Sequence, residues 1–168
     1  MFKLFLYVKI IDGVETMLIV AFSIVIIFID QLSKFLIRSN FHQSHQLSII
    51  GDYLYLTFVK NRGAAFGILK GQRSFFILIT VFLLIFIIYI YQNELKQTAA
   101  VKAAIGFLLG GSIANLIDRL LLHYVTDFIA FNLFDFYQLP VVNIADIFIF
   151  FGVLILIYNL LFSADRGV

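Results

Sequence analysis

Two aspartates in apolar surroundings are the residues of this sequence best suited to chemistry. Asp146 follows Asn143 by one helical turn and has only apolar neighbours otherwise, and Asp127 has only His123 as a nearby basic group. Carboxylates without a local counter-ion titrate nearer neutrality, and two brought together cannot both ionise easily. One can keep a proton while the other accepts one from water, as hydrolysis by a general acid and a general base requires. The residues alone leave equally open a pair that only orients loops.

A second set of charged residues is more typical of structural pairing. Asp30 and Lys34 are one helical turn apart, so they share a face, and mutual neutralisation is favoured over a direct catalytic role. Asp118 directly precedes Arg119 and fits a structural partner better than a reactive acid.

Small and amide side chains accompany these charges. Asn115 shares a predicted helix face with Asp118, and Gly110 and Gly111 lie about one turn earlier, where they permit close helix approach. Asn61 and Arg62 directly precede a glycine-rich stretch between two apolar segments.

The composition predicts a membrane protein. The chain has 168 residues, of which 62% are hydrophobic and 13% charged, with a mean hydropathy of +1.04. Soluble domains are about 45–50% apolar and about 25% charged. The formal net charge of +2 is too small to indicate nucleic-acid binding. The absence of cysteine excludes disulfides, thiolate metal sites and a cysteine nucleophile.

The elements that must position these residues are four apolar segments, each close to the roughly 20 residues that cross a bilayer. We expect spans at about residues 14–36, 74–91, 98–122 and 140–162, within one domain covering 1–168, with Pro140 in the first turn of the last span. The first span is expected to be uncleaved, with residues 1–12 on the membrane surface. If the spans alternate, all the polar residues above gather near one leaflet. Charges within spans cost about 2.5–3.5 kcal/mol each, which indicates a function.

The longest stretch between spans, residues 38–73, predicts a small extramembrane β structure. Residues 53–59 are aromatic and β-branched and are bounded by turn residues, as a strand should be. Residues 123–139 are predicted to form a second loop at the polar face. The expected fold is therefore an all-α membrane protein with four transmembrane helices and a small extramembrane β cap, or cradle, between the first and second.

Other functions are weighed against hydrolysis. His42 and His45 lack a nearby third ligand, so solvated loop histidines are favoured over a metal site. A small transporter or proton-conducting protein is the main alternative, since intramembrane polar residues also mark ion paths, but the second span is almost wholly apolar. A scaffold whose polar cluster only joins helices is the third. Lysines and arginines are divided too evenly between the two faces to predict the orientation.

Five sequence blocks, in this order, resemble the signal peptidase II family, the bacterial aspartic proteases that process prolipoproteins. They are residues 30–34 (DQLSK), 61–67 (NRGAAFG), 110–119 (GGSIANLIDR), 125–128 (VTDF) and 143–146 (NIAD). Each block alone is weak, but together they span nearly the whole chain at the family's spacings.

The resemblance implies a role for each matched residue. Asp127 and Asp146 correspond to the catalytic pair. The residues that correspond to supporting or substrate-contacting positions are Asp30, Lys34, Asn61, Arg62, Asn115, Asp118, Arg119 and Asn143.

The resemblance also implies a substrate and a location. The substrate would be a diacylglyceryl-modified prolipoprotein, cut before its lipidated cysteine, with membrane lipids as the surroundings. No metal, organic cofactor or nucleic acid is expected, and we expect a monomer. The protein would lie in the bacterial inner membrane with both termini cytoplasmic and the active site toward the outer leaflet.

Overall fold

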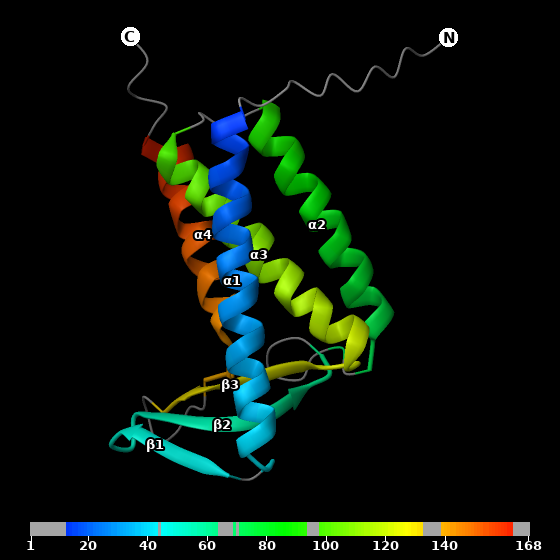
Figure 1. Cartoon of the computed structure of the whole chain (residues 1–168), viewed down its shortest axis with the longest axis vertical. Helices are drawn as coiled ribbons and strands as arrows, with labels where there is room; N and C mark the ends of the chain where they lie inside the picture. Colours follow the sequence, from blue (N-terminus) through cyan, green and yellow to red (C-terminus); the bar gives the residue numbers. More distant parts are fainter. Residues whose placement is uncertain are drawn as a thin grey trace.

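A computed structural model describes residues 13–43, 45–63, 69, 71–93, 98–132 and 139–162, without the side chains of residues 13–15. The predicted surface segment at residues 1–12 lies outside this part. The helices of the described residues are α1 (Gly13–Asn40), α2 (Arg73–Asn93), α3 (Ala99–Leu121) and α4 (Ile144–Phe162). All four are long and apolar enough to cross a membrane. They run side by side, and a small sheet covers one end of the bundle (Figure 1).

Helix α3 lies at the centre of the bundle because its glycines let α1 and α4 approach closely. A Cβ atom on Gly110 would lie 2.9 Å from the Cα atom of Ser23 in α1. A Cβ atom on Gly111 would lie 2.6 Å from the backbone oxygen of Ala145 in α4. Ser23 Oγ also donates to the backbone oxygen of Gly106 at 3.1 Å, which joins α1 to α3. The sequence prediction that these small residues permit close packing is confirmed.

Helix α2 packs mainly against α3. At one end, Tyr91 of α2 is buried against Val101 and Ile105 of α3. At the other end, Arg73 donates to the backbone oxygens of Arg119 and Leu120, at 2.8 and 3.0 Å. A cation at the carbonyl end of a helix is favourable because it satisfies free carbonyl groups and opposes the helix dipole.

The sheet contains β1 (Gln46–Ile50), β2 (Leu54–Asn61) and β3 (Val125–Phe131), in that order and antiparallel. The first two strands form the cap expected between α1 and α2. The prediction of a loop throughout residues 123–139 is wrong, because Val125–Phe131 is the third strand. The segment is rich in β-branched and aromatic residues, and β2 offers it an edge to pair with.

Helix α4 begins at Ile144, whereas the sequence predicts its start at Pro140. Two contacts account for the later start. Val142 is in a β-bridge with Ile129, so it is extended. Asn143 Oδ1 then accepts from the backbone N–H of Asp146 at 2.9 Å, which makes Asn143 the N-cap.

The last turns of α1 lie against the sheet (Figure 1). Ile37 of α1 packs with Phe58 of β2 and Phe128 of β3 in a buried apolar cluster. The sheet is therefore anchored to the end of the bundle at which α1 and α3 end and α4 begins.

Candidate active site

Asp127 and Asp146 line one cavity of about 210 Å³ at the sheet end of the bundle. The two residues come from β3 and from the first turn of α4. The other described residues that line the cavity are Asn61, Gly63, Asn115, Arg119, Val125, Pro140, Val141 and Val142. A water molecule occupies about 30 Å³ in the liquid, so the cavity has room for several waters or for part of a peptide.

Asp127 is 2% exposed and is held by two side-chain amides. Asn143 Nδ2 donates to its Oδ1 at 2.7 Å, and Asn61 Nδ2 donates to its Oδ2 at 2.8 Å. Burial, and after it the charge of Asp146, raises the pKa of Asp127 to about 7, although the two amides and Lys34 act in the opposite direction. The carboxyl group therefore exchanges its proton near neutral pH.

Asp146 is held by a different pair of N–H groups. Asn115 Nδ2 donates to its Oδ1 at 2.8 Å, and the backbone N–H of Asn143 donates to its Oδ2 at 3.2 Å. Because Asn143 also caps the backbone N–H of Asp146, the two residues form a reciprocal capping box. The capping interactions at the N-terminus of α4 thus fix the position of the Asp146 side chain in the first turn.

Asn143 joins the two carboxylates. It is fully buried, and its Nδ2 donates to Asp127 and, at 3.2 Å, to Oδ1 of Asn115. Asn115 in turn donates to Asp146. Asn143 and Asn115 therefore form a continuous hydrogen-bonded connection between the two aspartates.

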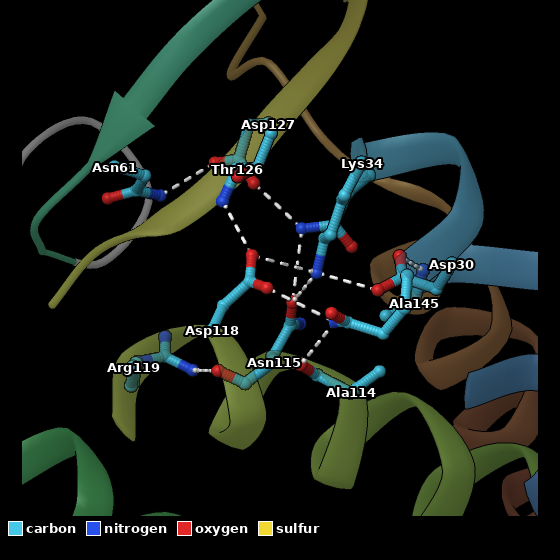
Figure 2. Close-up of polar contacts among 12 residues, drawn as sticks. Asp30, Lys34, Asn61, Ala114, Asn115, Asp118, Arg119, Thr126, Asp127 and Ala145 are labelled. Carbon is cyan, nitrogen blue, oxygen red and sulfur yellow. Dashed lines mark hydrogen bonds and ion pairs between the residues drawn. The ribbon is translucent and has the colours of Figure 1, made fainter. Parts of the chain in front are cut away.

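Behind the cavity lies a buried ion cluster centred on Lys34 (Figure 2). Lys34 Nζ lies 2.7 Å from Oδ2 of Asp30 and 3.4 Å from Oδ2 of Asp118. It also donates to Oδ1 of Asn115 at 2.8 Å. The ammonium group of Lys34 thus lies within 3.4 Å of three oxygen atoms, two of them from carboxylates. The predicted pairing of Asp30 with Lys34 is confirmed.

The two aspartates of this cluster also hold the elements that carry the cavity residues. Asp30 Oδ1 accepts from the backbone N–H of Ala145 at 2.8 Å, next to Asp146. Asp118 Oδ2 accepts from the backbone N–H of Thr126 at 2.9 Å, next to Asp127. Asp118 was predicted to be a structural partner, and the structure pairs it with Lys34 and Thr126.

The two predicted arginines lie in different places. Arg119 is half-buried, lines the cavity, and stacks its guanidinium on the ring of Phe76 at 5.3 Å. It donates to the backbone oxygen of Asn115 at 3.4 Å. Arg62 is exposed and is not among the described residues that line the cavity, and its backbone oxygen accepts from Gly71.

Three further residues belong to this region that the sequence did not single out as site residues. Gln31 donates to Oδ1 of Asp118 at 3.1 Å, Arg38 donates to Oγ1 of Thr126 at 3.0 Å, and Thr126 is fully buried. Gln31 and Thr126 carry a sequence signal, since they lie beside Asp30 and Asp127 within the matched blocks, whereas Arg38 carries none. Among the described residues, no three His, Cys, Asp or Glu side chains gather as metal ligands.

The arrangement is suited to hydrolysis by two carboxylates. Both aspartates reach one cavity, both are held by neutral N–H donors, and in the described part of the chain no cation forms an ion pair with either. One proton shared by such a pair supplies an acid and a base at once.

The family and its relatives are consistent with such a site. The family model described as signal peptidase (SPase) II matches residues 22–162. The chain is 39% identical to the lipoprotein signal peptidase of Moorella thermoacetica, over 86% of this chain and 93% of that protein. It is 42% identical to the lipoprotein signal peptidase of Shouchella clausii, over 83% and 89% respectively.

Two solved structures share the fold. Both are described as bacterial membrane enzymes determined by the in meso method, at 2.3 and 1.9 Å resolution. The first has a TM-score of 0.81 and 31% identity, with 93% of each chain covered. The second has a TM-score of 0.76 and 32% identity, covering 90% of this chain and 94% of the other. The expected fold class is confirmed.

Proposed function

Since this chain belongs to the signal peptidase II family, we infer that it is a multi-pass membrane protease that removes signal peptides from prolipoproteins. The observation that carries the proposal is the single cavity shared by Asp127 and Asp146. The transporter alternative is not favoured, because the relatives are named as peptidases and α2 is apolar over nearly its whole length.

The proposed reaction uses Asp127 and Asp146 as an aspartic acid–base pair. One carboxylate removes a proton from a water molecule, which attacks the scissile carbonyl carbon. The other carboxyl group is protonated and donates its proton to the carbonyl oxygen. As the C–N bond breaks, the first carboxyl group gives the proton taken from water to the leaving amine, and the second recovers its proton from the hydroxyl of the tetrahedral intermediate. A pKa of about 7 for Asp127 supports one shared proton at neutral pH. The proton belongs to the pair, because two coupled carboxylates titrate together.

The substrate is proposed to be a diacylglyceryl-modified prolipoprotein, cut just before the lipidated cysteine. Its signal helix would lie among the spans, and its acyl chains would extend into the bilayer. Arg119 and Asn61 line the cavity and carry N–H groups, so they are suited to hold the carbonyl groups of the substrate backbone. The stacking of Arg119 on Phe76 supports this role, because it keeps the guanidinium near the cavity.

The sheet end of the bundle is proposed to face outward, at the outer leaflet of the inner membrane, with both termini cytoplasmic. Because the chain has no cysteine, Asp52→Cys in the exposed turn between β1 and β2 creates a single reactive thiol. In right-side-out spheroplasts, a membrane-impermeant maleimide should label it without lysis. Labelling only after lysis would show that the sheet end faces the cytoplasm, which contradicts the proposed orientation.

The test of the proposed function is a cleavage assay with the purified full-length protein and a lipidated prolipoprotein. The wild-type protein should release the signal peptide, and Asp146→Asn should not. Asp52→Asn makes the same chemical change at an exposed turn and is the matched control. Full processing by Asp146→Asn would remove that residue from the mechanism, and transport without proteolysis would overturn the assignment.

A further inference from the structure

Strand β3 presents its neighbouring residues Thr126 and Asp127 to opposite faces of the sheet. Side chains alternate along a strand, so whatever fixes one of them fixes the direction of the next. Asp127 faces the cavity. Thr126 is fully buried on the other face, where its hydroxyl accepts from Arg38 in the last turn of α1.

Two helices hold Thr126. From α3, Oδ2 of Asp118 accepts the backbone N–H of Thr126 at 2.9 Å. From the last turn of α1, Nη1 of Arg38 donates to Oγ1 of Thr126 at 3.0 Å and lies 3.9 Å from Oδ1 of Asp118. The three residues form a clamp, here the Arg38–Thr126–Asp118 clamp, that joins α1, α3 and β3.

We propose that Arg38 and Thr126 are positioning residues for the reaction, acting through this clamp to hold Asp127 in line with Asp146. The inference rests on the proposed function. Neither residue is among the described residues that line the cavity, so neither is a catalytic residue.

The physical argument concerns the tolerance of acid–base chemistry to displacement. A shift of about 1 Å at a reacting group can cost about 100-fold in rate. Beyond Thr126, β3 is held by its pairing with β2, by the amide of Asn61 on Asp127 and by the bridge of Ile129 to Val142. The register of the pairing with β2 shifts between Leu56 and Val59, close to Asp127. The ladder near Asp127 is therefore irregular, and the clamp adds contacts from α1 and α3 to those that hold the strand.

A competing role for Arg38 is that of a surface cation which attracts a lipid phosphate, since its side chain is 22% exposed. The two roles differ in the kinetic constant that they change. Loss of a positioning contact lowers kcat with little change in KM, whereas loss of a uniform binding contact raises KM.

The experiment compares Arg38→Met, Thr126→Val and the double variant in the prolipoprotein cleavage assay. Each single variant should lower kcat about tenfold with KM within about twofold. The double variant should be no slower than the slower single variant, because both changes break the same contact. Thr126→Ser keeps the hydroxyl acceptor and should recover most of the rate lost in Thr126→Val.

Lys60→Met is the matched control, because Lys60 is an exposed cation on β2 paired across from Thr126 and lies outside the clamp. It should retain wild-type kcat. Thermal unfolding in detergent identifies variants that fail to fold, and Thr126→Ser then carries the test.

Three outcomes would overturn the inference. They are a raised KM at unchanged kcat in Arg38→Met, additive losses in the double variant, and Thr126→Ser as slow as Thr126→Val. A wild-type protein that leaves the prolipoprotein intact would instead overturn the proposed function, so the two failures are distinguishable.

Discussion

At the sheet end of the bundle, four of the described aspartates lie around the ion cluster and the cavity, and they have two kinds of partner. Asp30 and Asp118 are 0% and 1% exposed and both lie against the ammonium group of Lys34. Asp127 and Asp146 accept hydrogen bonds from neutral amides and reach the cavity. Burial alone therefore does not distinguish the proposed catalytic pair, since Asp30 is as buried as Asp127. The partner and the access to the cavity distinguish the two pairs, because Asp30 and Asp118 contact an ammonium group whereas Asp127 and Asp146 line the cavity and accept from amides.

The two regions share one residue, Asn115. Its Oδ1 accepts from Lys34, and its Nδ2 donates to Asp146. The ion cluster thus sets the orientation of the amide that holds a cavity carboxylate. The comparison predicts that substitutions in the cavity pair abolish cleavage without lowering the stability of the fold. Substitutions in the ion cluster should mainly lower the stability.

The largest effect is expected from Asp127→Asn. The substitution keeps the shape but removes the exchangeable proton, so the cleavage rate should fall at least about 1,000-fold, within the range for loss of an acid or base. The double variant Asp127→Asn, Asp146→Asn should be no slower than either single variant, because the two residues act as a unit. Cleavage rates are measured together with thermal unfolding, which should be unchanged. Additive rate losses in the double variant would contradict a mechanism in which the two residues act together.

Lys34→Met should mainly lower stability. It leaves Asp30 and Asp118 buried without their counter-ion, and breaking a buried pair costs about 3–5 kcal/mol. Neutralising both aspartates as well, with Asp30→Asn and Asp118→Asn, should recover part of the loss. Denaturant unfolding in detergent measures both changes. A Lys34→Met protein as stable as the wild type would contradict the prediction that the ion cluster mainly stabilises the fold.

Gly111→Ala should push α4, which carries Asp146, away from α3, which carries Asn115. Its Cβ atom would lie 2.6 Å from the backbone oxygen of Ala145, so α4 must move away from α3. This movement would increase the distance between Asp146 and Asn115, which are hydrogen-bonded in the wild-type protein. We expect the cleavage rate to fall about 10- to 100-fold, as for other small displacements of reacting groups. Ser112→Ala, at the next position of α3, is the control. Equal cleavage rates in both variants would show that the close packing of α4 against α3 at Gly111 is not critical for activity.

The pH dependence should reflect the cavity pair. With a pKa of about 7, Asp127 keeps its proton below neutrality and loses it above, in the presence of Asp146 and Lys34. When both carboxyl groups are ionised the acid is missing, so kcat/KM should fall as pH rises beyond about 7, about tenfold for each pH unit. A profile flat to pH 9 would exclude a shared proton as the cause of activity.

Much of the fold follows from local patterns that a sequence shows directly. The length and hydropathy of the apolar segments indicate four spans, because a bilayer requires about 20 apolar residues whatever surrounds them. The spacing of Asp30 and Lys34 predicts their pairing, because residues one turn apart share a helix face. Alternate crossing of the spans was enough to expect the polar residues at one end.

Other features depended on contacts between distant parts of the chain. Val125–Phe131 became a strand because β2 offers it an edge, and α4 starts after Pro140 because Val142 bridges to Ile129. Asp118 lies beside Arg119 in sequence, yet its cation partners are Lys34 and Arg38, 84 and 80 positions earlier in the chain. No local rule predicts such a choice.

The sequence by itself determined the number of spans and the end of the bundle at which the polar groups lie, since hydropathy and helical period act over a few residues. Only the tertiary structure decided which carboxylates meet Lys34 and which meet an amide across the cavity. That choice depends on how closely α1 and α4 approach α3, and a contact between helices is set by the packing of all of them together.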